Sequence, residues 1–213
     1  MREPLTIAVG QPLCVPCDVA ANALAHAATV RAAGARVVVF PEMSLTGYEF
    51  DAPPIAIEDP RLEPIVEACA ETGSVALVGA PVHGEVGGSH IAMLAIDKTG
   101  VTVAYQKMWL GGAEPERFAP GSEPAVLEVD GWRLGLAICK DTGIPQHASD
   151  TAALGIDAYV RRRPGVGGRC CHRGRTRSSR RSRPPRLGRD RQLRRVDGRR
   201  LRPGGRRLGH LVA

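Results

Sequence analysis

The first 40 residues alternate between short apolar runs and one longer amphipathic stretch. Residues 5–10 and 36–40 are apolar runs of the length expected for buried β-strands. Between them, Asp18 is a suitable helix N-cap residue and Gly34 a suitable C-terminal stop, so residues 18–34 are predicted to form a helix. The order strand, helix, strand is typical of an α/β fold.

Two predicted helices each have an apolar and a polar side. In the first helix, the polar residues Asn22, His26 and Thr29 fall away from the apolar positions, so we expect His26 to lie at the surface. A second helix is predicted over residues 59–73, where apolar residues follow the spacing i, i+3, i+4, i+7: Leu62, Ile65, Val66 and Cys69. This spacing places Cys69 in the core.

Strand-like patterns dominate the chain after the second helix. The predicted strands cover residues 74–82, 90–97, 101–106, 125–129 and 132–138. Asp130-Gly131, a strong hairpin signal, separates the last two. A β-α-β-α order followed by several strands predicts helices that cover one face of a mixed sheet.

Three residues with charged or reactive side chains come just after predicted strands: Glu42, Lys107 and Cys139. In open α/β sheets, binding and catalytic sites are built at the carboxyl ends of the strands. Cys139 also precedes a helix-like stretch at residues 145–154. A strand-to-helix turn there would lift the thiol out of the sheet, as nucleophile elbows do.

Each of these residues also has a simpler explanation. A lone cysteine usually packs in the core as a small hydrophobe, and a lone glutamate or lysine is usually solvated at the surface. Together, however, the three supply the parts of thiol-based acyl transfer. These parts are a base for the thiol proton, a cation for the charge of the tetrahedral intermediate, and the thiolate itself. Their shared placement at strand ends favours the catalytic interpretation.

Three sequence blocks resemble, in order and spacing, the signature blocks of the nitrilase, or carbon–nitrogen hydrolase, superfamily. The blocks are VVFPEMSLTGY at residues 38–48, YQK at 105–107 followed by FAPG at 118–121, and LAICKD at 136–141. The resemblance runs from residue 5 to GIDAYV at residues 155–160. It implies an α/β fold of the nitrilase type, an αββα sandwich, and a Glu-Lys-Cys triad that works without metal or cofactor.

The resemblance assigns a role to each member of the triad. Glu42 would be the general base, Lys107 the cation that stabilises the oxyanion, and Cys139 the nucleophile. Resembling enzymes hydrolyse amides, ureido acids, N-carbamoyl compounds or nitriles through a thioester or thioimidate. We therefore expect a small-molecule substrate of one of these classes, and a homodimer is compatible with the resemblance.

The resemblance also implies a second glutamate near the site. Counting back four residues from Phe118 selects Glu114, with Glu116 as the competing choice. Some neighbouring positions depart from the family pattern, because an aromatic residue usually follows the nucleophile, and Glu and Arg are more common in the stretch after Pro145. The residues found there are Lys140, Gln146 and Asp150. Since such neighbours shape the pocket, the sequence leaves the choice among the substrate classes open.

Charge divides the chain into two unlike parts. Residues 1–160 hold 9 Lys+Arg and 20 Asp+Glu, a balance of −11, whereas residues 161–213 hold 20 Arg, no Lys and 2 Asp, a balance of +18. The two balances add up to the net charge of +7. The first part therefore has the composition of an acidic globular domain, and the basic character lies in the second part.

The Arg-rich part has two interpretations. A disordered basic arm of this kind would neutralise nucleic-acid phosphates, but Tyr, Phe and Trp, on which single-stranded bases stack, are absent from it. An out-of-frame translation of a G+C-rich gene explains the exclusive use of arginine better, and we favour it. Nucleic-acid binding is then expected only non-specifically, through this tail.

The frameshift interpretation divides the chain at residue 160. Residues 1–160 would form a carbon–nitrogen hydrolase-like domain that lacks the later part of its sandwich. Residues 161–213 would be a low-complexity basic tail, disordered or out of frame. We expect little or no activity from such a chain; the alternative to an enzyme is a non-enzymatic remnant or a nucleic-acid-binding protein acting through the tail.

Cysteine usage and hydropathy bear on location. Six irregularly placed cysteines suit a reducing compartment, and no stretch reaches the ~20 apolar residues of a membrane span, so we expect a cytoplasmic protein without a membrane partner. CVPC at residues 14–17 has the spacing of a zinc or redox motif, and CCH at 170–172 could complete a ligand set. We expect no zinc site, because the second group lies in compositionally biased sequence.

Overall fold

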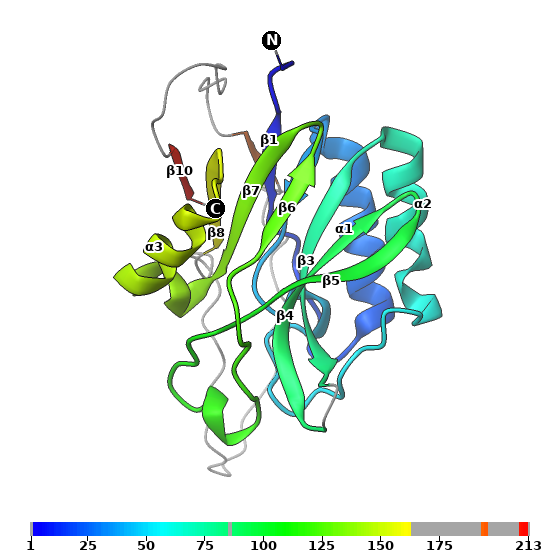
Figure 1. Ribbon diagram of the computed structural model, residues 1–213. Helices are drawn as coiled ribbons and strands as arrows, with labels where there is room; N and C mark the ends of the chain where they lie inside the picture. The colour runs from blue at the N-terminus through cyan, green and yellow to red at the C-terminus, as the bar shows by residue number, and fades with distance from the viewer. Residues whose placement is uncertain (1, 85–86, 163–192, 196–208, 213) are drawn as a thin grey trace, which may run out of the picture.

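Two β-sheets face each other in the computed structural model, with helices on both outer sides (Figure 1). The structure describes residues 2–84, 87–162, 193–195 and 209–212. The strand order is β5-β4-β3-β2-β1-β9 in the first sheet and β10-β8-β7-β6 in the second. This is the α/β sandwich that the resemblance implies, whereas the pattern of helices and strands alone predicts a single mixed sheet.

The first sheet joins a parallel half to an antiparallel half. Its strands are β1 (Ile7–Gly10), β2 (Val37–Val39), β3 (Val75–His83), β4 (Ser89–Asp97), β5 (Gly100–Gln106) and β9 (Leu193–Arg195). β2 runs parallel to both β1 and β3, and β3, β4 and β5 form an antiparallel meander. Parallel neighbours put the end of β2 at the carboxyl edge of the sheet, where Glu42 follows.

The second sheet carries the cysteine strand at its centre. Its strands are β6 (Val126–Val129), β7 (Trp132–Ile138), β8 (Ala158–Arg162) and β10 (Gly209–Val212). β7 pairs antiparallel with β6 and parallel with β8. The strands predicted between residues 5 and 138 are all present, with ends that differ by at most two residues.

In the part of the chain that the structure describes, three α-helices cover the sheets: α1 (Val19–Ala33), α2 (Glu63–Thr72) and α3 (Pro145–Ala153). The carboxylate of Asp18 accepts a hydrogen bond from the Ala21 amide at 3.0 Å, and Gly34 ends α1 in the left-handed conformation with φ of 56°. α1 and α2 lie on the outer side of the first sheet and α3 on that of the second (Figure 1). Among the described residues, no helix is both long enough and apolar enough to cross a membrane.

The hydrophobic core has two layers, and alternate residues of β2 pack into one layer or the other. Val38 belongs to the layer between α1, α2 and the first sheet, whereas Val37 and Val39 belong to the layer between the two sheets. Because both faces of β2 are covered, its sequence is an uninterrupted apolar run rather than an alternating one. Cys69 is fully buried in the helix layer, as predicted.

The prediction that His26 lies at the surface is wrong. His26 is fully buried and its ring packs on Phe40 with the centroids 4.4 Å apart. Nδ1 lies 2.6 Å from the Asn22 carbonyl oxygen, to which it must donate, so Nε2 accepts from the Ser44 hydroxyl at 2.8 Å. A helical wheel treats such a polar residue as exposed, because it does not show a partner on another segment.

Three short stretches of the Arg-rich tail fall within the described residues: 161–162, 193–195 and 209–212. β8 continues two residues beyond residue 160, β9 pairs antiparallel with β1, and β10 pairs parallel with β8. The rest of the tail, including Cys170, Cys171 and His172, lies outside the described residues. The boundary at residue 160 and the disordered or out-of-frame character of residues 161–213 stay predictions.

Gly79 in β3 lets the segment that carries Glu42 lie directly on the strand. A Cβ atom at position 79 would come within 2.4 Å of the Met43 nitrogen and 2.5 Å of the Pro41 oxygen, distances too short for any real contact. Both neighbours are backbone atoms, so they cannot be relieved by a change of side-chain rotamer. The absence of a side chain at this position thus sets the height of the Glu42 segment above the sheet.

We predict that Gly79→Ala lowers the free energy of unfolding by about 1–3 kcal/mol, as overpacking of a tight core does. The measurement is urea-induced unfolding followed by circular dichroism. Gly143→Ala is the matched control, because no atom lies within 4 Å of the Cβ that it would add. Equal stability of the two variants would contradict the prediction.

Candidate active site

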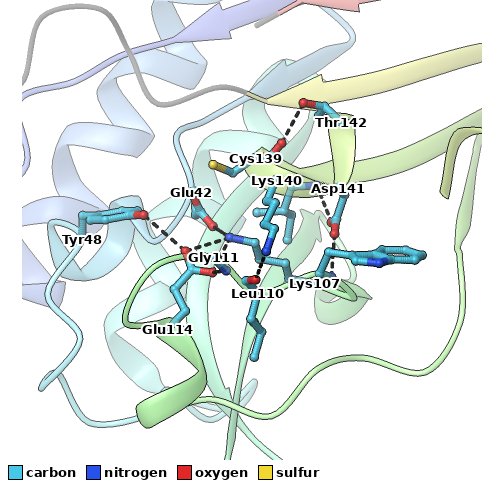
Figure 2. A network of polar contacts seen from close by, with 12 residues as sticks. Glu42, Tyr48, Lys107, Leu110, Gly111, Glu114, Cys139, Lys140, Asp141 and Thr142 are labelled. Atoms are coloured by element: carbon cyan, nitrogen blue, oxygen red, sulfur yellow. Dashed lines mark hydrogen bonds and ion pairs between the residues drawn. The ribbon is translucent and has the colours of Figure 1, made fainter. Parts of the chain in front are cut away.

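Three strand ends bring Glu42, Lys107 and Cys139 together at one edge of the sandwich (Figure 2). Glu42 follows β2 and Lys107 follows β5, both in the first sheet, while Cys139 follows β7 in the second. The backbone at Lys107 is still fixed by the sheet, because its amide donates a hydrogen bond to the Ile91 carbonyl in β4 at 2.8 Å. The structure thus brings the three residues together, and their catalytic roles stay a prediction.

A buried lysine between two carboxylates is the centre of the site. Lys107 Nζ donates to Glu42 Oε1 at 2.6 Å and to both carboxylate oxygens of Glu114, at 2.8 and 2.7 Å. The three side chains are 0%, 1% and 4% exposed, in the order Lys107, Glu42, Glu114. One ammonium and two carboxylates leave this buried cluster with one net negative charge.

The structure separates the two candidates for the second glutamate. Glu114 is buried, and its Oε2 also accepts a hydrogen bond from the Gly111 amide at 2.7 Å. Tyr48 donates to Glu114 Oε1 at 3.4 Å. Glu116, in the same 3₁₀ turn, is exposed. The carboxylate beside Lys107 is therefore Glu114.

Cys139 sits on a turn rather than inside a strand. Its φ is 45°, a left-handed conformation that is rare outside glycine, and the 3₁₀ turn Cys139–Gly143 begins at this residue. The residue is partly exposed, unlike the core cysteine Cys69. Such local strain at the end of a buried strand is common at functional sites, and the simpler explanation as a core hydrophobe does not fit it.

The two carboxylate oxygens of Glu42 have different surroundings. Oε1 binds Lys107, whereas Oε2 is buried and accepts no hydrogen bond from a nitrogen or oxygen donor of the described residues. A hydrogen bond between the Cys139 thiol and the Glu42 carboxylate contributes to the pKa of both groups. The Cys139 sulfur lies on the same side as this carboxylate in Figure 2. An acceptor oxygen placed beside a thiol is what a base needs in order to take the thiol proton.

Burial dominates the protonation states of the site. It raises the pKa of the Cys139 thiol to about 11, and the negative charge of Glu42 adds to this increase. Burial also raises the pKa of Glu42, although Lys107 opposes the increase. For Lys107, burial acts to lower the pKa, but Glu42 and Glu114 outweigh it, so the net change is upward. At neutral pH the thiol is therefore protonated and the lysine charged, and a thiolate forms only if a base removes the proton.

Asp141 braces the two segments that carry Cys139 and Lys107. Its carboxylate accepts hydrogen bonds from the Ile138 amide at 3.0 Å, from the Trp109 amide at 2.8 Å and from the Tyr105 hydroxyl at 2.8 Å. Ile138 directly precedes Cys139, and Trp109 lies two residues after Lys107. Sequence reasoning missed this role, because a single Asp after a strand resembles an ordinary surface residue.

The residues that depart from the family pattern occupy the rim of the site and the outer helix. Lys140 Nζ donates to the Leu110 carbonyl at 2.6 Å, which ties the cysteine turn to the segment leading to Glu114. Gln146 donates to Asp150 at 2.7 Å along α3. Within the described part of the chain, no cluster of three or more His, Cys, Asp or Glu side chains could hold a metal ion.

We predict that Glu42→Gln raises stability at pH 8. A pKa raised by folding means that ionisation of Glu42 costs stability as the pH rises through the folded-state pKa. Removing the charge should therefore raise the free energy of unfolding at pH 8 by about 1–3 kcal/mol, the usual penalty for desolvating a polar group, which the pairing of Oε1 with Lys107 offsets only in part. The difference from the unsubstituted protein should shrink towards pH ~4, as Glu42 becomes protonated in both states.

Urea-induced unfolding between pH 4 and pH 8 tests this prediction. The control is Glu116→Gln, which removes an exposed charge from a neighbouring segment and should show no such pH-dependent difference. A Glu42→Gln variant less stable than the unsubstituted protein at pH 8 would show that pairing with Lys107 outweighs the burial of the carboxylate.

Comparison with known proteins identifies the family. A family model described as carbon-nitrogen hydrolase matches residues 6–191. The chain is 30% identical over 154 residues to a hydrolase of the pqqF 5′ region of Pseudomonas protegens, which covers 68% of this chain and 54% of that protein. It is 26% identical over 129 residues to an (R)-stereoselective amidase of Pseudomonas sp., with 58% and 46% covered.

A solved structure supports the same assignment. An amidase from Nesterenkonia sp. superposes with a TM-score of 0.63 at 25% identity, and the match covers 78% of this chain and 68% of that one. The chain spans about half the length of the curated relatives that it matches. Because the family model covers most of the chain, this protein belongs to the carbon–nitrogen hydrolase family.

Proposed function

We propose that this protein hydrolyses the non-peptide C–N bond of a small amide through a covalent intermediate on Cys139. The observation that carries the proposal is the buried cluster in which Lys107 bonds both Glu42 and Glu114 beside a strained, partly exposed cysteine. A core cysteine would need none of these charges near it, since burying them costs free energy.

The first half of the reaction forms the thioester. Glu42 removes the thiol proton of Cys139 as the sulfur attacks the amide carbon, because a thiol with a pKa of about 11 is protonated at neutral pH. The carbonyl oxygen becomes negatively charged, and the Lys107 ammonium stabilises that charge. The C–N bond then breaks, and the departing nitrogen takes the proton that Glu42 had accepted, so ammonia or an amine leaves.

The second half releases the acid. Glu42, again ionised, takes a proton from a water molecule as the water oxygen attacks the thioester carbon. The bond between carbon and sulfur breaks, the sulfur recovers the proton, and the carboxylic acid departs. In each half of the reaction Glu42 first accepts a proton and then gives it back. A carboxylate that does this near neutral pH needs a pKa higher than usual, and burial raises the pKa of Glu42.

Glu114 acts in this mechanism through Lys107. Its two oxygens hold the ammonium from one side, and the Gly111 amide and the Tyr48 hydroxyl hold the carboxylate. The lysine therefore keeps its place and its charge when Glu42 becomes protonated during the reaction.

The proposed substrate class rests on the amidases among the similar proteins. Ureido acids, N-carbamoyl compounds and nitriles would react at the same thiol with the same base, so they belong in the substrate panel. Lys140 stands where the resembling enzymes usually have an aromatic residue, and its ammonium is fixed on the rim by the Leu110 carbonyl. The preferred substrate is therefore expected to differ in shape or charge from those of the relatives.

Cys139→Ala is predicted to abolish hydrolysis, because the proposed thioester forms on the sulfur that this substitution removes. The assay measures ammonia release from a panel of small amides, ureido acids and nitriles. Cys17→Ala is the control, since it removes an exposed thiol in a loop before α1 and should leave the rate unchanged. Turnover that survives in Cys139→Ala would refute the proposed nucleophile.

Glu114→Gln is predicted to lower kcat by about 100-fold, because misplacement of a catalytic group by about 1 Å has an effect of that size. KM should change little, since the interaction is with Lys107 rather than with the substrate. Glu116→Gln is the matched control, because this glutamate lies two residues further on and is exposed. Equal activity of the two variants would show that Glu114 has no part in catalysis.

A further inference from the structure

A chain of buried polar groups lies behind the candidate active site and takes no part in the chemistry described above. It links four elements through Tyr105 in β5, Asp141 in the turn after β7, His147 in α3 and Tyr159 in β8. The Tyr105 hydroxyl lies 2.8 Å from Asp141 Oδ2 and 2.9 Å from His147 Nε2. At the other side of the ring, His147 Nδ1 lies 2.6 Å from the Tyr159 hydroxyl.

The donors and acceptors in this chain can be assigned in order. The Asp141 carboxylate can only accept, so the single hydroxyl proton of Tyr105 is donated to it. Tyr105 oxygen must then accept from His147, which places the ring proton on Nε2. Burial lowers the pKa of His147, so the ring is neutral and Nδ1 accepts from the Tyr159 hydroxyl. Each group in the series thus donates towards Asp141.

The end of this chain is the residue that positions the reactive segments. Asp141 receives the amide of Ile138, next to the cysteine, and the amide of Trp109, just after the lysine. His147 therefore acts on both segments through Tyr105 and Asp141. All four side chains of the series are buried, and hydrogen bonds aligned in one direction in a buried site strengthen one another.

We propose that His147, as the neutral imidazole with its proton on Nε2, is a positioning residue that fixes the Cys139 turn relative to the Lys107 segment. The effect on catalysis rests on the proposed function, whereas the effect on local structure does not. The His147 ring also packs edge-on against Trp109, with the ring centroids 5.4 Å apart. An aromatic or aliphatic side chain could replace this packing, but it could not donate the hydrogen bond that holds the Tyr105 hydroxyl in place.

The first test measures the proton and the braced amides directly by NMR of the full chain. Long-range ¹H–¹⁵N spectra should show His147 protonated on Nε2 alone at pH 7; protonation on Nδ1 alone or on both nitrogens would overturn the proposal. In His147→Leu, exchange of the Ile138 and Trp109 amide hydrogens should accelerate by about tenfold, the result of losing one buried hydrogen bond. The Leu136 amide, in the middle of β7, should be unaffected.

Matched variants separate positioning from general loss of stability. Tyr159→Phe removes the hydroxyl that donates to His147 in the hydrogen-bond series. It should accelerate hydrogen exchange at the Ile138 and Trp109 amides by less than His147→Leu does. This variant provides the test if His147→Leu does not fold. His90→Gln is the control, because His90 bonds the Ala119 carbonyl away from this network and its loss should change neither amide. Uniform acceleration along β7, or none at Ile138 and Trp109, would overturn the proposal.

Kinetics provide a second readout. His147→Leu should lower kcat by about 10- to 100-fold with little change in KM, since misplaced reactive groups lose rate rather than binding. His147→Gln, which keeps one donor and one acceptor, should recover at least part of that loss; equal losses in the two variants would contradict a hydrogen-bonding role. If the unsubstituted protein hydrolyses none of the substrates, the proposed function fails, and the NMR results still decide the role of His147.

Discussion

Burial of the Lys107 ammonium between two carboxylates is the interaction on which the rest of the site depends. A lysine is almost never fully buried unless it is paired, so Glu42 and Glu114 must both come within hydrogen-bond distance of it. Glu42 and Lys107 come from two strands of one sheet, and Glu114 from the connection that leads to the other sheet. The ion-pair cluster therefore fixes the segments at the edge where the sheets meet.

This cluster is poorly explained as a source of stability. Buried ion pairs often contribute less than well-packed apolar groups of similar size, and this one carries an excess negative charge. Burial, and after it the negative charge of Glu42, raises the pKa of the Cys139 thiol to about 11, so the thiol is protonated at neutral pH. Burial thus favours the protonated form of Cys139 and makes the ionised form of Glu42 costly, an arrangement suited to the proposed proton transfer between them.

Sequence reasoning predicted the features that follow from strand ends and missed those that depend on contacts between distant elements. The sequence predicts a shared site for Glu42, Lys107 and Cys139 because each of them follows a recognisable apolar run. The family resemblance leaves two candidate positions for the second glutamate. The burial of Glu114 separates it from Glu116, and only the fold shows this. His26 was misplaced for the same reason, since its partner Ser44 lies on another segment.

Local sequence patterns also could not predict the hydrogen-bond network around Asp141 or the packing of two sheets face to face. Tyr105, His147 and Tyr159 lie in three different elements, and nothing in their spacing along the chain indicates that they meet. A list of strands also does not state where one sheet ends and the next begins. The sandwich came from the family resemblance, which carries information about the assembled fold that periodicity lacks.

The contact between the Glu42 segment and the bare backbone of Gly79 has a consequence for how this site can change. A Cβ atom at position 79 would collide with the backbone of the Glu42 segment, so substitution at this position of the underlying strand has no means of moving Glu42 gradually. The segment from Leu110 to Glu114 and the side chain of Lys140 rest on each other instead, outside the sheets. Substitutions at these outer contacts can therefore alter the surroundings of the site without displacing Glu42.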